Sequence, residues 1–186
     1  MRTRQRSFEF KTWGGARAGA GRKPRRGRPG VVHRRRPVLK SRFPVHVTWR
    51  MRAGVWNLRS QRCFTALARA FFGGGDRFGF RLVHYSVQGN HVHLLVEAHD
   101  ERSLSRAMCG LGVRVARGLN RVMRRHGKVL DDRYHGRILR TPTEVKRARD
   151  YLLQNAQKHF GLRFADPYTS AAPLITPRTF LLRRIC

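Results

Sequence analysis

Two histidines one residue apart form the pattern in this chain that is most able to do chemistry. His91 and His93 flank Val92 in a stretch whose composition indicates a β-strand. Residues i and i+2 of a strand project from the same face, so both imidazoles point one way while Val92 points the other way. Two neutral imidazoles held side by side can share one divalent cation. An ordinary surface pair, or a phosphate contact, is the alternative interpretation of the same residues.

A tyrosine and an amide share a helical spacing further along the chain. Tyr151 and Asn155 are four residues apart, so on a helix they lie one turn from each other on one face. That face borders the apolar positions Ala148, Leu152 and Ala156, which should rest against a sheet. A tyrosine hydroxyl is a nucleophile and an amide oxygen is a ligand for hard cations. The alternatives are a half-buried packing tyrosine and a helix-surface amide.

The remaining candidates are weaker. Tyr85, Tyr134 and Tyr168 have no amide one helical turn onward. His46 lies on the polar side of its strand, where a structural role and a DNA contact are both compatible with its position. Three cysteines, Cys63, Cys109 and Cys186, have no metal-like spacing and form no disulfide pattern, so we expect reduced thiols.

Hydrophobic periodicity predicts the elements that must position these residues. The predicted order is a strand at 44–51, a helix at 59–72, strands at 80–87 and 91–97, a helix at 101–126, a strand at 136–140 and a helix at 141–159. The last helix has a sharp start, with Thr141 as N-cap, Pro142 at the first helical position and Glu144 completing a capping box.

This order predicts the fold class α+β. Strand, helix, strand, strand, helix, strand is the ferredoxin-like (RRM-like) split βαβ pattern, here followed by an extra C-terminal helix that carries Tyr151. We expect the domain to span residues 43–161, between a disordered basic arm at 1–42 and a loosely ordered tail at 162–186.

The charge of the chain is far from that of an ordinary globular protein. It has 41 Lys and Arg against 10 Asp and Glu, a formal net charge of +31. Such a balance indicates a nucleic-acid partner. No apolar run approaches the roughly 20 residues of a spanning helix, and the N-terminal residues do not resemble a signal peptide. We therefore expect no membrane partner and a cytoplasmic, nucleoid-associated location.

Two basic segments are expected to contact DNA. The arm holds 15 of the Lys and Arg and one acid, Glu9. Within it, Arg25, Arg26 and Arg28 form a stretch similar to an AT-hook, whose alternative is a solvated basic linker. The long helix carries a second stripe that would face water or phosphates, made of Arg114, Arg117, Arg121 and Arg124.

At two motifs the chain resembles a known family. The stretch Asn90-His91-Val92-His93-Leu94-Leu95-Val96 resembles the His-hydrophobic-His (HUH) signature of the single-tyrosine transposases, and Tyr151-Leu152-Leu153-Gln154-Asn155 resembles their nucleophile helix. The pair Arg133-Tyr134 resembles a further family feature. An Asn at the last ligand position is most similar to the REP-associated tyrosine transposases. The turn Gln88-Gly89-Asn90 departs from the usual Met-Pro-Asn of relatives, which affects the turn and not the ligands.

The resemblance, which covers residues 44–161, implies a function. His91, His93 and Asn155 would bind Mg²⁺ or Mn²⁺, and Tyr151 would attack a phosphate of single-stranded, hairpin-flanked DNA to form a 5′-phosphotyrosine. Arg133 would join the other basic residues in DNA binding. The family includes monomers and homodimers, so either state is expected.

Two other classes of protein remain open at this point. A non-catalytic DNA- or RNA-binding protein derived from such a transposase is the main alternative. An RNA-recognition module would show aromatics interleaved with Arg on its central strands, whereas His91 and His93 occupy these positions here. A basic structural protein of a ribonucleoprotein explains the charge and leaves the two motifs to chance.

Overall fold

A computed structural model describes residues 37–160 and 166–170, with side chains of the last helix described up to residue 154. The elements are β1 (Val45–Arg50), α1 (Gln61–Gly74), β2 (Asp76–Arg77), β3 (Phe80–Val87), β4 (His91–Ala98), α2 (Glu101–Val122), β5 (His135–Ile138) and α3 (Pro142–Phe160). The predicted order is confirmed, and the two-residue strand β2 is added to it.

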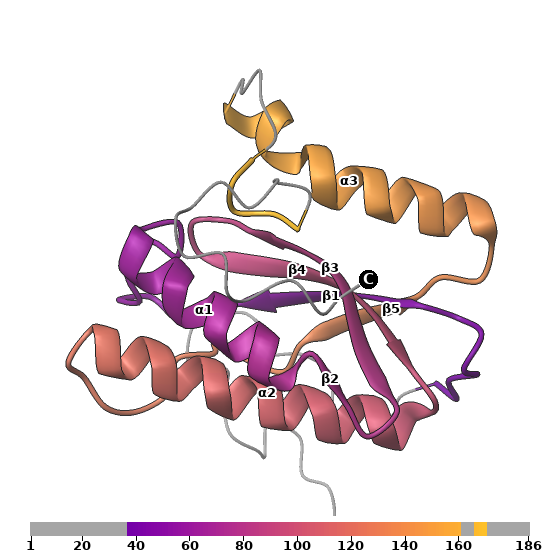
Figure 1. Ribbon diagram of the computed structural model, residues 1–186, viewed down its shortest axis with the longest axis horizontal. Coiled ribbons are helices and arrows are strands. Elements are labelled where there is room, and N and C mark those ends of the chain that lie inside the picture. The colour runs from indigo at the N-terminus through magenta and orange to yellow at the C-terminus, as the bar shows by residue number, and fades with distance from the viewer. Residues whose placement is uncertain (1–36, 161–165, 171–186) are drawn as a thin grey trace, which may run out of the picture. The chain divides into compact units, whose positions relative to one another are not determined.

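The strands form one antiparallel sheet in the order β2-β3-β4-β1-β5 (Figure 1). The β3–β4 hairpin is the one predicted around the turn at residues 88–90. β1 lies between β4 and β5, and its register places Thr48 opposite both His93 and His135. Three strands that are distant in sequence therefore each contribute one polar residue to a row across the sheet, namely Thr48, His93 and His135.

Alternation along the strands divides the interior into two layers. Val92, Leu94 and Val96 of β4 face the main core, which is shared with α1 and α2. Leu95 faces the other way, into a smaller cluster with Leu139 and with Ala148 and Leu152 of α3. The ribbon shows the same arrangement, with α1 and α2 on one face of the sheet and α3 on the other (Figure 1). His91 and His93 accordingly point toward the α3 side, as the alternation predicts.

The start of α3 is fixed by the predicted capping box. The hydroxyl of Thr141 accepts a hydrogen bond from the backbone N–H of Glu144 at 3.2 Å, and the Glu144 carboxylate accepts one from the N–H of Thr141 at 3.2 Å. The same carboxylate accepts hydrogen bonds from the Arg140 N–H and the Arg137 side chain, which lower the pKa of Glu144. This cap fixes the phase of α3, because it determines which residues begin the first turn.

A β-bulge explains why the alternation of β3 is ambiguous in the sequence. The pairing of β3 with β4 shifts register between Leu82 and His84. Leu82 and Tyr85 face the main core, whereas Val83 packs with the cluster beneath α3. An extra residue in one strand moves every later side chain to the opposite face, so simple alternation fails there.

The boundaries of the folded part differ from those predicted. Leu39, placed in the arm by its sequence, is 4% exposed and belongs to the main core. The tail was predicted to be loosely ordered, but Asp166 is fully buried and forms an ion pair with Arg59 at 2.7 Å. The Ser170 N–H donates to the carbonyl of Tyr85, and Thr169 forms a β-bridge with Ser86. These residues therefore pair with the C-terminal end of β3, whereas β2 pairs with its N-terminal end. Apolar and ionic contacts with distant residues therefore hold Leu39 and Asp166 in the fold.

The other helix limits are close to those predicted. Ser60 caps α1 by accepting from the N–H of Cys63, so Arg59 stands outside the helix and is available to Asp166. α2 begins after Asp100 and ends at Val122, four residues before the predicted end. None of the helices in the described ranges is long and apolar enough to cross a bilayer.

Candidate active site beneath helix α3

The two histidines of β4 lie side by side on the sheet face below α3. The ring centroids of His91 and His93 are 4.9 Å apart and their planes are nearly perpendicular, at 88°. His93 is buried, with 6% of its surface exposed, whereas His91 is half-buried. The shared orientation expected from the i, i+2 spacing is therefore present, with one ring toward the interior and one toward solvent.

Helix α3 brings Tyr151 to the buried histidine. Ala148 and Leu152 anchor the helix on the sheet, and Leu152 is fully buried. Tyr151 stands at the edge of that apolar face, 39% exposed, with its ring centroid 5.3 Å from that of His93. A ring with one flank packed and the other open can meet a substrate in solution. Asn155 lies in α3, but its side chain is outside the part of the chain that the structure describes.

Two residues of β1 complete this cluster and were not identified as site residues from the sequence. His46 Nε2 and Thr48 Oγ1 each lie 3.2 Å from Nδ1 of His93. The His46 ring also packs against Tyr151, with centroids 6.1 Å apart. Burial lowers the pKa of His46, and electrostatic interaction with His135 and Arg137 on β5 lowers it further. His46 is therefore held in its neutral form at pH 7.

Each of the two imidazoles has one ring nitrogen, Nδ1, engaged by a neighbouring side chain. In His91, Nδ1 lies 2.8 Å from Oδ1 of Asn90, and in His93, Nδ1 is engaged by β1. Nε2 is thus the nitrogen that each ring would present to a metal. Within the described ranges, no three His, Cys, Asp or Glu side chains gather in a way that suits a metal ion. A site here would need the two imidazoles and a ligand of another kind, which is the role predicted for Asn155.

The other tyrosines lie away from this cluster. Tyr85 faces the main core against Phe71, where burial raises the pKa of its hydroxyl. Tyr134 is buried and packs edge-on against Trp49 in the same core. Tyr168 packs on Phe64. Each is a packing residue, so Tyr151 is the tyrosine that the fold brings to the histidines among the residues that the structure describes.

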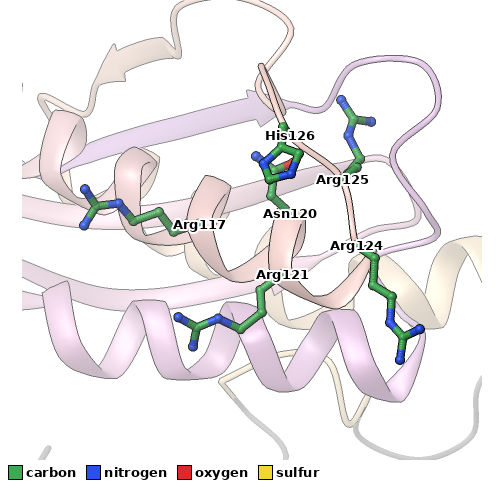
Figure 2. Close-up of a pocket in the computed structure, with 6 residues that line it drawn as sticks. All are labelled: Arg117, Asn120, Arg121, Arg124, Arg125 and His126. Atoms are coloured by element: carbon green, nitrogen blue, oxygen red, sulfur yellow. The ribbon is translucent and has the colours of Figure 1, made fainter.

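The predicted DNA-binding arginines are not gathered at this site. The α2 stripe is exposed on the layer opposite α3, and its C-terminal end surrounds a surface hollow of about 510 Å³ (Figure 2). The residues that line this hollow are Arg117, Asn120, Arg121, Arg124, Arg125 and His126. Arg114 lies beside the end of α1, next to Gly74. Arg133 is exposed just before β5, and Arg25, Arg26 and Arg28 lie outside the described residues.

Comparison with solved structures defines the fold class. The fold is similar to that of a REP-associated tyrosine transposase solved with a REP hairpin, with a TM-score of 0.60 and 14% identity over 76% of this chain and 83% of that one. A crystal structure of a Deinococcus radiodurans R1 protein with a provisional transposase name matches at a TM-score of 0.42 and 16% identity, over 57% of this chain and 85% of that one. No curated protein sequence matches the chain.

The sequence itself gives the family. The pattern of the family described as "Transposase IS200 like" matches residues 39–151, more than half of the chain. The chain belongs to this family of transposases, which confirms the resemblance noted at the HUH motif and at Tyr151. The matched range contains His91, His93 and Tyr151, so the side chains that meet beneath α3 lie within the part of the chain that the family shares.

Proposed function

We propose that this protein cleaves and rejoins single-stranded DNA, with Tyr151 as the nucleophile and a divalent metal held by His91, His93 and Asn155. The observation that carries the proposal is the meeting of three rings from two separate elements. The ring centroid of Tyr151 in α3 lies 5.3 Å from that of His93 in β4, and the His93 centroid lies 4.9 Å from that of His91. In this arrangement a partly exposed tyrosine hydroxyl could act as nucleophile beside a metal ion bound by the paired imidazoles.

The metal is assigned from the donor set. Two imidazoles and one amide oxygen leave coordination positions for phosphate and water. Mg²⁺ prefers oxygen ligands, so a site with two nitrogens binds it weakly and accepts Mn²⁺ readily. Bound by these residues, such an ion would polarise a non-bridging oxygen of the scissile phosphate and offset the charge that develops there.

In the proposed reaction, the chemical steps fall on Tyr151. The Tyr151 hydroxyl loses its proton as its oxygen attacks phosphorus, and the bond from phosphorus to the 3′ oxygen breaks. The departing 3′ oxygen takes up a proton, which leaves a free 3′-hydroxyl and a 5′-phosphotyrosine on the protein. In rejoining, a second strand's 3′-hydroxyl attacks this phosphotyrosine, and the Tyr151 oxygen recovers its proton. The covalent link conserves the energy of the phosphodiester, so rejoining needs no ATP.

DNA is the expected partner because of charge and family. The REP-associated relative was solved with a hairpin, and we propose a hairpin-flanked single strand as substrate here. The stripe Arg114, Arg117, Arg121 and Arg124 would contact phosphates on the layer opposite Tyr151, and Arg133 would do so near β5. The α2 hollow has several guanidinium groups and no carboxylate in its lining, which favours a polyanion.

The strand order supports the ferredoxin-like assignment. In the split βαβ pattern, the first and third long strands are neighbours at the centre of the sheet. Here β1 and β4 occupy that place, with helices α1 and α2 following them in the chain. The helix α3 is the addition, and we propose that its task is to carry the nucleophile.

The test is the covalent adduct. Purified protein is incubated with Mn²⁺ and single-stranded hairpin oligonucleotides from the flanks of its gene, and adducts are resolved by denaturing electrophoresis. We expect a protein–DNA adduct that mass spectrometry maps to Tyr151. Tyr151→Phe should abolish it while DNA affinity is retained, because only one partly exposed hydroxyl is removed.

The matched control is Tyr85→Phe, which removes a hydroxyl in the main core and should leave adduct formation intact. An adduct that maps to Tyr85 or Tyr134 would overturn the assignment of the nucleophile. Tight DNA binding with no adduct under any metal would favour the non-catalytic binding protein instead.

A further inference from the structure

We infer that His46 is a positioning residue for this reaction, acting with Thr48 to fix the ring of His93 in the tautomer that binds metal. The inference rests on the proposed function, since it assigns His93 as a ligand. It adds a role to two residues of β1 that neither the HUH motif nor the tyrosine helix contains.

The sheet register creates the contact. Thr48 is directly opposite His93 in the β1–β4 ladder, and His46 is the next residue on the same face of β1. Cross-strand neighbours on one face come within side-chain contact, and so do diagonal neighbours when a side chain is long. Both side chains reach the same atom, Nδ1 of His93, at 3.2 Å. The His46 and His93 rings are 5.3 Å apart between centroids.

The contact bears on which nitrogen of His93 carries the proton. A neutral imidazole has one N–H donor and one acceptor nitrogen. If Nδ1 of His93 donates to Nε2 of His46 or to Oγ1 of Thr48, then Nε2 of His93 is the unprotonated nitrogen. A metal-binding histidine is commonly held in this way, with its other ring N–H donated to a neighbour. The opposite tautomer would place the proton on the nitrogen needed for the metal.

His46 has a second contact that Thr48 lacks. Its ring packs edge-on against Tyr151, at 6.1 Å between centroids and an interplanar angle of 64°. One side chain therefore touches both the predicted ligand and the predicted nucleophile. For this reason His46 is the stronger positioning residue of the two.

The first test reads the tautomers directly and needs neither metal nor activity. Long-range ¹⁵N–¹H correlation spectra of imidazole-labelled protein distinguish protonated from bare ring nitrogens. We expect His93 to carry its proton on Nδ1, and His46 to have a bare Nε2. In the double variant His46→Phe, Thr48→Val, the His93 signals should move toward a mixture of both tautomers. A wild-type His93 with its proton on Nε2 would overturn the inference.

The second test measures Mn²⁺ affinity by calorimetry, together with adduct formation. His46→Phe should weaken Mn²⁺ binding by about 10- to 100-fold and reduce adduct formation, while metal-free DNA binding stays unchanged. His46→Gln should recover most of the affinity, because its amide oxygen can accept where Nε2 of His46 did. Thr65→Val, which removes a hydroxyl that donates to the Gln61 carbonyl within α1, is the control for the threonine change in the double variant.

The outcomes separate the two proposals. If the wild type neither binds Mn²⁺ nor forms the adduct, the proposed function fails. If it does both and His46→Phe matches it, this inference fails. If His46→Phe does not fold, as shown by circular dichroism, His46→Gln and the wild-type spectra decide the question. A His46→Gln variant that folds and loses Mn²⁺ affinity as completely as a ligand variant would count against a positioning role.

Discussion

At the scale of single residues, the site depends on how two neighbouring imidazoles differ. His91 is half-buried and bonded to the adjacent Asn90, whereas His93 is buried and held by a different strand. His93 is thus enclosed by the fold, whereas His91 is more open to solvent.

The prediction at this scale concerns the metal. His91→Ala and His93→Ala should each eliminate cleavage and weaken Mn²⁺ binding, measured by adduct formation and calorimetry. Asn155→Ala should be milder, because water can replace one oxygen ligand. EDTA should stop the wild-type reaction, and Mn²⁺ should restore it at least as well as Mg²⁺.

The control for this prediction is His99→Ala, which removes an exposed imidazole just after β4 and should change neither quantity. His91→Ala is the cleaner of the two ligand variants, because truncation of the buried His93 also leaves a cavity. Cleavage that continues undiminished in EDTA, or unchanged Mn²⁺ binding in the double histidine variant, would show that the imidazoles are not a metal site.

At the scale of elements, the sheet is held in position from both sides by close packing. α2 passes close to β1 at Gly112, where an added Cβ would lie 2.9 Å from the Trp49 ring and 3.2 Å from Leu130. That contact supports the core-facing side of the strand whose other face carries His46 and Thr48. On the other face of the sheet, Ala148 and Leu152 pack α3 against β3 and β4. The position of Tyr151 relative to His93 therefore depends on contacts on both faces.

The prediction at this scale compares two glycines of α2. Gly112→Ala should destabilise the fold by about 1–3 kcal/mol, because the added methyl group overlaps the buried Trp49 ring. Gly110→Ala lies on the same helix with no atom within 4 Å of the new methyl group. It should stabilise the fold by about 0.5–1 kcal/mol through helix propensity. Denaturant unfolding followed by circular dichroism measures both, and equal effects would mean that α2 does not approach β1 this closely.

At the scale of the whole molecule, charge determines how the chain meets its substrate. A net charge of +31 attracts any nucleic acid over long distances, and its effect weakens as salt is added. The described part of the chain has basic groups on both faces of the sheet, at α2 and near α3. We therefore expect overall DNA affinity and the chemistry proposed for Tyr151 to be separable.

The prediction at this scale is the removal of residues 1–36, the part of the predicted arm that precedes the ordered core residue Leu39. The deletion takes away 13 of the 41 Lys and Arg, so DNA affinity should fall and its dependence on salt concentration should become less steep. Adduct formation at saturating DNA should be retained. Fluorescence anisotropy over a salt series measures the slope.

A second variant keeps these 36 residues and replaces their Lys and Arg with Gln, which separates charge from length. It should behave like the deletion. If either variant fails to form the adduct even when fully bound to DNA, the arm contributes to the active site.

The sequence by itself determined what depends on residues close together in the chain. The shared face of His91 and His93 follows from strand alternation, and the start of α3 follows from the capping box at Thr141 and Glu144. The order of elements follows from hydrophobic periodicity. Each of these is decided within a few residues, where side-chain spacing and local hydrogen bonds dominate.

Tertiary structure decided which of these segments meet. His46 and His93 are 47 residues apart, and their contact exists because β1 pairs with β4. Packing on the two faces of the sheet leaves the α2 arginines on the opposite layer from Tyr151, and a buried ion pair joins Asp166 to Arg59. Strand order and layer assignment result from burying apolar faces against distant partners. Local patterns do not encode that choice, so only the folded chain shows that β1 supplies His46 and Thr48 to the site.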